Sequence, residues 1–276
     1  MASYNTIGPR ASHTTLAWLS DIHLEFLHTR GAADFYREIK KAPVDGIILT
    51  GDISSSFRIG QNLTELASLG KPVYFTTGNH EYFGSSFAAV DEEIADTCSK
   101  TAGLVRLGQG EIVRLSTDTV LIGHAGWGDG RAGLGSKSTF KMDDAEAIEE
   151  FRGLSQTNLF RKLRTLGDSA ARYIEHLLPL AAAHADTVYI ATHVPPFTKA
   201  ARHGKGNSSP EALPYFTNQA LGEVLLRFAL KWPSKCMVVL CGHTHTCCQY
   251  QPTANLLVKV AGVRLGSPKI QEILTA

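Results

Sequence analysis

Apolar runs and amphipathic stretches alternate along the first third of the chain. The apolar runs have the length and continuity of strands buried on both faces, and they predict strands at about 15–20, 45–50 and 72–77. The amphipathic stretches predict helices at about 31–42, 57–69 and 84–101. This rhythm of strand, helix and strand predicts parallel pairing with right-handed crossovers.

The rest of the chain mixes a hairpin, long helices and loops. Two short apolar runs at about 111–115 and 119–124 predict an antiparallel hairpin, and a glycine-rich loop follows at 124–130. Helices are expected at about 143–152, 156–184 and 218–231, with Gly167 as a candidate break in the second. Further strands are expected at about 187–192, 236–241, 246–251 and 255–260. The Gly- and Ser-rich stretch from Lys199 to Pro214 predicts a long surface loop.

A short polar cluster directly follows five of the apolar runs, and each cluster offers a side chain that can bind a divalent cation. If the five strands lie side by side in one sheet region, their ends converge and the clusters form one site. Two pairs of candidates are each two residues apart, a spacing that on an extended strand end directs both side chains the same way. The candidate metal ligands are Asp21, His23, Asp52, Asn79, His193, His243 and His245.

Seven candidate ligands are too many for one tetrahedral ion. They suit two ions that share a carboxylate, for which Asp52 is the natural bridge, and two-metal hydrolytic sites hold their ions roughly 3.5–4 Å apart. Two divalent cations carry four positive charges. Asp21, Asp52 and a bridging hydroxide supply three negative charges, so about one positive charge remains. That residual charge suits a phosphate oxyanion, so a chain with a net charge of only +1 can still attract an anionic substrate locally.

The five clusters together resemble the calcineurin-like metallophosphoesterase superfamily. Its pattern is D-x-H, G-D, G-N-H-[DE], H and G-H-x-H, each after a strand, and every part is present in order between Asp21 and His245. The resemblance implies an α/β fold in four layers, a β-sandwich of two mixed sheets flanked by helices. It also implies a first metal held by Asp21, His23, Asp52 and His245, and a second held by Asp52, Asn79, His193 and His243.

The same resemblance implies a mechanism and a cofactor. A hydroxide bridging the two metals would attack phosphorus, with Asp52 bridging the ions and His80 binding the phosphate or protonating the leaving oxygen. Glu81 would orient His80 or a metal ligand. The ligand set suits Mn, Fe, Zn or Co.

The expected substrate is a small phosphodiester or phosphomonoester. The run G-D-x-x-D-R-G of the protein-phosphatase branch is missing, because Ile53, Ser54 and Ser55 follow Asp52. Near-neutral charge and the lack of an evident capping domain argue against a processive nuclease. There are two alternatives. One is a nuclease acting on DNA or RNA ends, whose binding to nucleic acid would weaken steeply as the salt concentration rises. The other is a non-catalytic scaffold. Scaffold relatives usually lose ligands, whereas this chain keeps all seven and His80.

Four residues outside the motifs are candidates for substrate or pocket contacts. His28 lies five residues past His23, and His124 ends a predicted strand at the same edge. His203 lies in the long basic loop, where it could touch the substrate or face solvent. Trp127 could stack on a planar group or wedge its glycine-rich loop against the core, and the structural role is favoured.

Length and composition favour one domain. The 276 residues, 43% of them apolar, predict a flexible tail over 1–14 and a single metallophosphoesterase domain over 15–276. No signal-peptide-like segment precedes Thr15, and no run reaches the roughly 18 apolar residues of a membrane span. The five cysteines form no CxxC pair and predict no disulfide framework. A cytoplasmic protein that binds neither membrane nor nucleic acid is expected, and its oligomeric state stays open.

Overall fold

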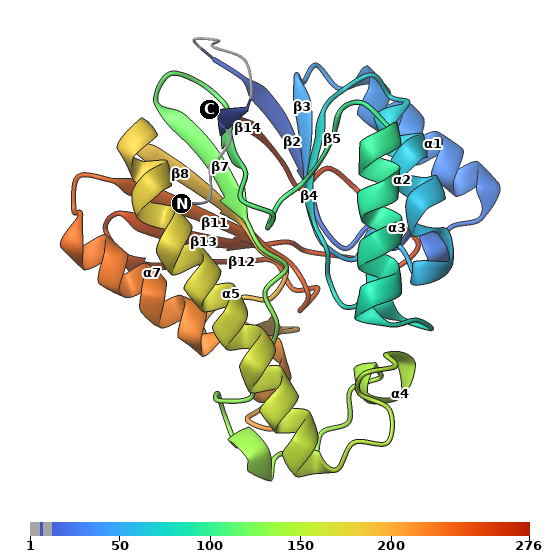
Figure 1. Ribbon diagram of the computed structural model, residues 1–276. Coiled ribbons are helices and arrows are strands. Elements are labelled where there is room, and N and C mark those ends of the chain that lie inside the picture. The colour runs from blue at the N-terminus through green and yellow to red at the C-terminus, as the bar shows by residue number, and fades with distance from the viewer. Residues whose placement is uncertain (1–5, 8–12) are drawn as a thin grey trace.

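Two β-sheets pack face to face, with helices on both outer faces (Figure 1). The computed structural model describes residues 6–7 and 13–276. The five-stranded sheet has the order β14-β2-β3-β4-β5, in which β2 to β5 run parallel and β14 is antiparallel to β2. Its strands are β2 (Thr15–Leu19), β3 (Gly46–Thr50), β4 (Val73–Thr76), β5 (Leu104–Arg106) and β14 (Glu272–Thr275).

The second sheet has seven strands in the order β1-β6-β7-β8-β11-β13-β12. Its centre, from β7 to β13, is parallel, whereas β6–β7 and β12–β13 are antiparallel pairs. Its strands are β1 (Thr6–Ile7), β6 (Ile112–Arg114), β7 (Thr119–Gly123), β8 (Thr187–Ala191), β11 (Cys236–Cys241), β12 (Cys248–Thr253) and β13 (Leu256–Val260). A separate hairpin joins β9 (Arg202–His203) and β10 (Gly206–Asn207) within the predicted long loop.

The helices divide between the two outer faces (Figure 1). The five-stranded sheet is covered by α1 (Thr29–Lys41), α2 (Ile59–Ala67) and α3 (Phe87–Lys100), and the seven-stranded sheet by α5 (Gln156–His184) and α7 (Gln219–Lys231). Two short helices, α4 (Asp144–Ala147) and α6 (Leu213–Phe216), lie in connections. None of the helices in 6–7 and 13–276 combines the length and apolarity needed to cross a bilayer.

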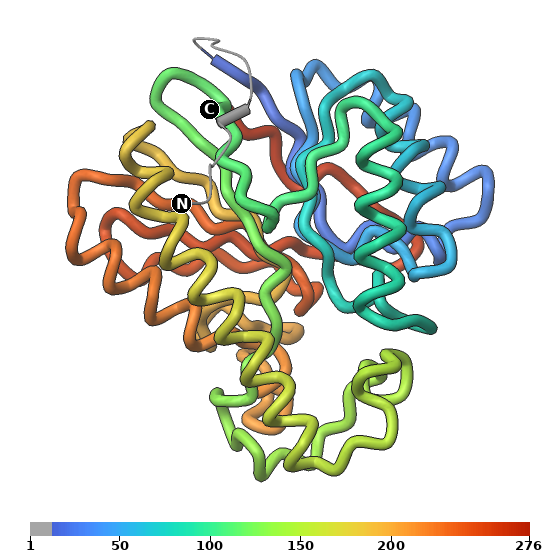
Figure 2. The backbone as a smooth tube through the Cα atoms, in the orientation of Figure 1, coloured from blue at the N-terminus to red at the C-terminus, as the bar shows by residue number. Residues whose placement is uncertain are grey.

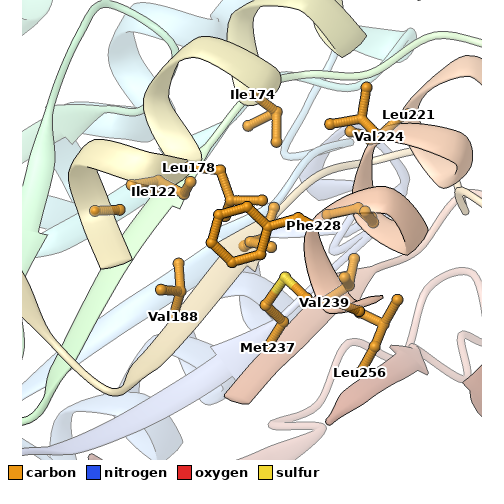
Figure 3. Close-up of a cluster of buried hydrophobic side chains, with 14 of the residues drawn as sticks. Ile122, Ile174, Leu178, Val188, Leu221, Val224, Phe228, Met237, Val239 and Leu256 are labelled. Atoms are coloured by element: carbon orange, nitrogen blue, oxygen red, sulfur yellow. The ribbon is translucent and has the colours of Figure 1, made fainter. Parts of the chain in front are cut away.

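Three apolar clusters separate the layers. One lies between the two sheets and includes Leu16, Ile48, Leu121 and Leu240, which are at most 1% exposed. A second packs α5 and α7 onto the seven-stranded sheet, with Phe228 central among the labelled side chains of Figure 3. The third packs α1 to α3 onto the five-stranded sheet. The sequence of layers helix, sheet, sheet, helix confirms the expected four-layer sandwich of two mixed sheets.

The strands that carry the polar clusters are split between the sheets, so the expectation of a single sheet region is wrong. β2, β3 and β4 are neighbours in one sheet, and β8 and β11 are neighbours in the other. Their carboxyl ends meet across the sandwich. The sequence pattern missed β1, β5 and β14, which are short strands at the edges of the two sheets. α5 runs through Gly167 without a break, and the helix expected at 143–152 is only the single turn α4.

Most of the predicted tail, residues 1–5 and 8–12, lies outside the described residues. Thr6–Ile7 nevertheless pair in parallel with Ile112–Val113. Thr14 is buried, and its backbone N donates a hydrogen bond to Ala276 O at 3.1 Å. Ordered structure therefore begins before the expected boundary at residue 15, whereas the division into one domain stays a prediction.

A lobe extends from the sandwich between β7 and α5, although no capping element was expected. In Figure 2 the green-to-yellow tube leaves the sheets, forms this lobe with α4 and returns along α5. The lobe docks on the loop after β4, where Gly84 N donates to Ala147 O at 2.8 Å and Glu149 N donates to Ser85 O at 3.1 Å. It therefore stands beside the sheet edge at which the polar clusters meet.

Candidate metal centre

The loops that carry the predicted ligands turn sharply where their strands end. Among the described residues, the non-glycine residues with positive φ have φ between 42° and 66°, and all belong to the predicted ligand set. Such a backbone costs roughly 1–3 kcal/mol per residue and clusters at functional sites. The expectation that paired ligands continue an extended strand is therefore wrong. The residues are Asp21, His23, Asp52, His243 and His245.

Hydrogen bonds tie these loops together across the two sheets. Within the five-stranded sheet, Asp21 N donates to Gly51 O at 3.0 Å. From the other sheet, His243 N donates to Asp21 Oδ1 at 2.9 Å. His193 Nδ1 donates to Thr50 O at 2.9 Å, so Nε2 is the ring nitrogen that faces the other ligands and would bind a metal in place of its proton.

The first group of converging ligands consists of Asp21, His23, Asp52 and His245, whose ligand atoms all lie within 4.8 Å of one another. His245 Nε2 lies 3.2 Å from Asp21 Oδ1 and 3.2 Å from His23 Nε2. His23 Nε2 lies 3.7 Å from Asp52 Oδ2. Two ring nitrogens and two carboxylates converging in this way form a donor set that suits a divalent cation.

The second group shares Asp52 with the first. Asp52, His193 and His243 have ligand atoms within 4.8 Å of one another, and Asp52 Oδ2 lies 3.3 Å from His193 Nε2. Asn79 Oδ1 joins them, 3.2 Å from His193 Nε2 and 3.1 Å from His243 Nδ1. A cavity of about 10 Å³ beside these side chains has room for one water-sized occupant.

Asp144 orients Asn79 within the second group. Asn79 Nδ2 donates to Asp144 Oδ1 at 2.9 Å, which turns Asn79 Oδ1 toward the histidines. Asp144 is buried at the start of α4, so the lobe contributes directly to the centre. Sequence reasoning missed this residue, because nothing in the local pattern connects it with a strand end.

The electrostatics of the centre favour added positive charge. Burial opposes ionisation of Asp52, but nearby His193 and His80 hold its pKa well below the usual value. Burial also opposes ionisation of Asp21, and the hydrogen bond from His245 still lowers its pKa. Burial and the charge of His193 lower the pKa of His243 to about 3, which keeps this ring neutral and able to bind a metal.

The residues therefore fit two divalent cations in donor type and charge. Asp21, His23, Asp52 and His245 would hold one ion. Asp52, Asn79, His193 and His243 would hold the other.

His80 lies beside the centre and is held by Glu25. Its backbone N donates to Asp52 Oδ1 at 3.0 Å, and its Nδ1 lies 3.0 Å from Glu25 Oε1. The same Glu25 oxygen lies 3.2 Å from His23 Nδ1. Burial would lower the pKa of His80, but Asp52 and Glu25 raise it to about 9. Sequence reasoning missed Glu25, although a carboxylate two residues after a candidate ligand is a signal that could have found it.

Of the two roles expected for Glu81, its contacts favour support of a metal ligand over support of His80. Its buried carboxylate accepts hydrogen bonds from the backbone N of four residues in the loops after β3 and β4, and in the part of the chain described it makes no hydrogen bond to His80. Burial and the charge of Asp52 raise the pKa of Glu81 to about 7. Glu81 therefore joins two ligand loops. The four donors are Asp52, Ile53, Ser54 and Gly78.

The remaining candidates lie away from the converging ligands or have structural contacts. His28 is exposed and caps α1, accepting a hydrogen bond from Gly31 N at 3.2 Å, so a pocket role is not supported. His203 is exposed on the β9–β10 hairpin. His124 lines a separate cavity of about 260 Å³ behind Trp127. Trp127 is 7% exposed and separates that cavity from the centre, which agrees with the structural role.

A family model for calcineurin-like phosphoesterases matches residues 14–247. No curated protein sequence matches the chain. Among solved structures, a dimetal phosphatase from Danio rerio has a TM-score of 0.58 at 14% identity, covering 95% of this chain and 92% of that one. The protein TT1561 of Thermus thermophilus has a TM-score of 0.51 at 11% identity, covering 95% of this chain and 98% of its own.

A putative 5′-nucleotidase from Staphylococcus aureus has a TM-score of 0.51 at 13% identity, covering 91% of this chain but 49% of its own length. At these identities the structural similarity shows the fold alone. The family model, in contrast, spans most of the chain and all of the predicted ligands between Asp21 and His245. The chain therefore belongs to the calcineurin-like phosphoesterase family.

Proposed function

We propose that this protein hydrolyses phosphodiesters or phosphomonoesters of small molecules with two divalent cations bound by its seven candidate ligands. The observation that carries the proposal is the pair of ligand groups that share Asp52 Oδ2, with His80 alongside. Two buried carboxylates that stay ionised among histidines give the site its demand for cations. When bound, the cations would activate water and neutralise phosphoryl oxygens as Lewis acids.

The chain's own residues have distinct tasks in this reaction. Asp52 fixes the spacing of the two ligand groups, and Asn79, oriented by Asp144, completes the second. His80 Nδ1–H is directed at Glu25 Oε1, so the proton for the leaving oxygen comes from Nε2. In the metal-free protein, Asp52 and Glu25 raise the pKa of His80, and Glu25 would remain beside the ring as a charged partner when Asp52 binds the cations. Glu25 holds the ring in one orientation while it gives up the proton.

The test measures hydrolysis of bis(4-nitrophenyl) phosphate and of 4-nitrophenyl phosphate. The purified protein is stripped with a chelator and reloaded with Mn²⁺, and in parallel with Zn²⁺, Co²⁺ or Fe²⁺. We expect hydrolysis of at least one ester only after reloading. A protein that binds two equivalents of metal and cleaves neither ester with any of them would be a scaffold. Cleavage confined to DNA or RNA ends, with an activity that falls steeply as the salt concentration rises, would identify a nuclease.

A further inference from the structure

Three single 3₁₀ turns stand side by side at the edge of the five-stranded sheet. They are η1 (Leu24–Phe26), η2 (Ser56–Arg58) and η3 (His80–Tyr82), and they follow the neighbouring strands β2, β3 and β4. η2 is tied to the residue after η3, because Ser56 Oγ donates to Phe83 O at 2.6 Å. Each turn, or the residue directly after it, carries a phenylalanine. We call Phe26, Phe57 and Phe83 the aromatic rim.

Two rings of the aromatic rim contact His80. Phe83 stacks on the His80 ring with centroids 4.3 Å apart and an interplanar angle of 26°. Phe26 meets the same ring edge-on, at 6.3 Å and 75°. Phe26 is 52% exposed and Phe57 is 94% exposed. Exposed aromatic side chains gathered beside a polar centre are typical of a ligand-binding surface.

The opposite side of the centre is closed by the lobe and by α6. Asp144 and Tyr215 are buried there next to Asn79 and His243, and the cavity of about 10 Å³ between them admits no more than a water-sized group. On the rim side, the side chains of His80 and His245 are 22% and 33% exposed. An ester substrate therefore reaches the centre past His80 and the aromatic rim.

We propose that the aromatic rim binds a planar aromatic group, a nucleobase or an aryl ring, carried by the leaving alcohol of the substrate. The inference rests on the proposed function, in which His80 protonates the leaving oxygen. In that reaction water loses a proton to solvent as its oxygen bonds to phosphorus, the ester P–O bond breaks, the proton of His80 passes to the departing oxygen, and solvent returns a proton to His80. Because Phe26 and Phe83 both contact the His80 ring, the group attached to that oxygen is the part of the substrate that lies against Phe26.

The test uses adenosine 5′-monophosphate and ribose 5-phosphate, in which the departing oxygen is the same primary hydroxyl of ribose and the leaving alcohol differs by the base. For a protein that cleaves only diesters, their methyl esters serve instead. With Mn²⁺-loaded protein we expect kcat/KM to be about 5- to 150-fold higher for the adenosine ester, mainly through KM, as stacking predicts. Adenosine should inhibit competitively, whereas ribose should not.

The variants separate the rim from the metal centre. Phe26→Ala should lower kcat/KM for the adenosine ester much more than kcat/KM for the ribose ester, so that most of the preference is lost, whereas Phe26→Trp should keep the preference. Leu230→Ala, at a 73% exposed apolar residue on α7, is the control and should change neither value. Equal kcat/KM for both esters, or an equal loss on both in Phe26→Ala, overturns the inference and leaves the proposed function standing. Absence of all hydrolysis, including that of 4-nitrophenyl esters, overturns both.

Discussion

Glu25 Oε1 lies 3.0 Å from His80 Nδ1, and the same oxygen lies 3.2 Å from His23 Nδ1. One carboxylate therefore orients the proposed proton donor and a proposed metal ligand at once. The interaction with the two rings lowers the pKa of Glu25 to about 2 in spite of its burial, so the carboxylate stays charged. Metal binding and proton transfer are thus connected through a residue that contacts neither the metals nor the substrate in the proposed mechanism.

Substitution of Glu25 tests this connection. Glu25→Gln keeps an oxygen that can accept from one ring but removes the charge, and we expect turnover to fall about 10- to 100-fold. The loss should be larger for an alkyl phosphate than for a 4-nitrophenyl ester, since a good leaving group needs little protonation. Steady-state kinetics on both esters measure the difference. Glu25→Asp should recover part of the loss, and an equal loss on both esters would contradict a role through His80.

The roles of Asp52 and His80 are separated by metal content. Asp52→Ala should lose both metal and activity, because both ligand groups use its Oδ2. His80→Ala should retain the metals and lose about 10²- to 10⁴-fold in turnover, the usual contribution of general acid catalysis. Metal analysis of dialysed protein together with turnover distinguishes the two. Equal metal loss in both variants would show that the assigned roles are wrong.

Glu81 is expected to matter for stability as well as for metal binding. Glu81→Ala leaves the buried backbone N of Asp52, Ile53 and Gly78 without the acceptor that joins their loops. We expect the free energy of unfolding to fall by at least about 3 kcal/mol, at about 1–3 kcal/mol per unsatisfied group. Chemical denaturation in the presence of chelator measures the loss. Glu92→Ala, at an exposed residue of α3, is the matched control and should change stability little.

The parts of the fold that could be predicted are those whose information is local. The runs ending at Leu19, Thr50 and Ala191 are long and apolar enough to identify buried strands, and the motifs directly after them identify candidate ligands. The two-residue spacing of Asp21 and His23 predicted that their side chains converge, and they do. The assumed reason, an extended strand end, was wrong. The left-handed backbone at both residues depends on contacts with the loop at Gly51 and Asp52, far away in the sequence.

The parts that could not be predicted depend on contacts between distant segments. Asp144 reaches Asn79 only because the lobe folds back on the loop after β4. The local sequence around Asp144 resembles an ordinary solvated helix, so its burial was not visible. β14 forms because Ile273 and Leu274 pair with Ala17 and Leu16 at the edge of the sheet, and its four residues carry little periodicity of their own.

His124 should make the stability of the metal-free protein depend on pH. Burial, with a smaller contribution from the charge of Arg106, lowers its pKa to about 4 from an ordinary value near 6.5. Between these values the unfolded chain binds the proton more readily, so the free energy of unfolding falls as the pH falls from 6.5 toward 4. His124→Gln should remove about 2 kcal/mol of the difference in stability between pH 7 and pH 4.5. Urea denaturation with chelator at both pH values measures this, and an unchanged difference would contradict a half-buried, neutral His124 ring.

Gly78 illustrates how the backbone of the motif leaves room for the ligands. A Cβ atom at this position would collide with Asp52 Oδ1 and lie 2.8 Å from His193 Nε2, although the glycine does not have a positive φ. Gly78→Ala should therefore displace both side chains, weaken metal affinity at least about 10-fold and reduce turnover in parallel. Destabilisation from the added methyl group should be about 1–3 kcal/mol. Isothermal titration with Mn²⁺ and thermal melting measure the two effects.

Gly206→Ala is the matched control, since a Cβ there meets no atom within 4 Å, and it should bind Mn²⁺ as the natural protein does. Normal Mn²⁺ affinity in Gly78→Ala would mean that Asp52 and His193 do not hold the ion together.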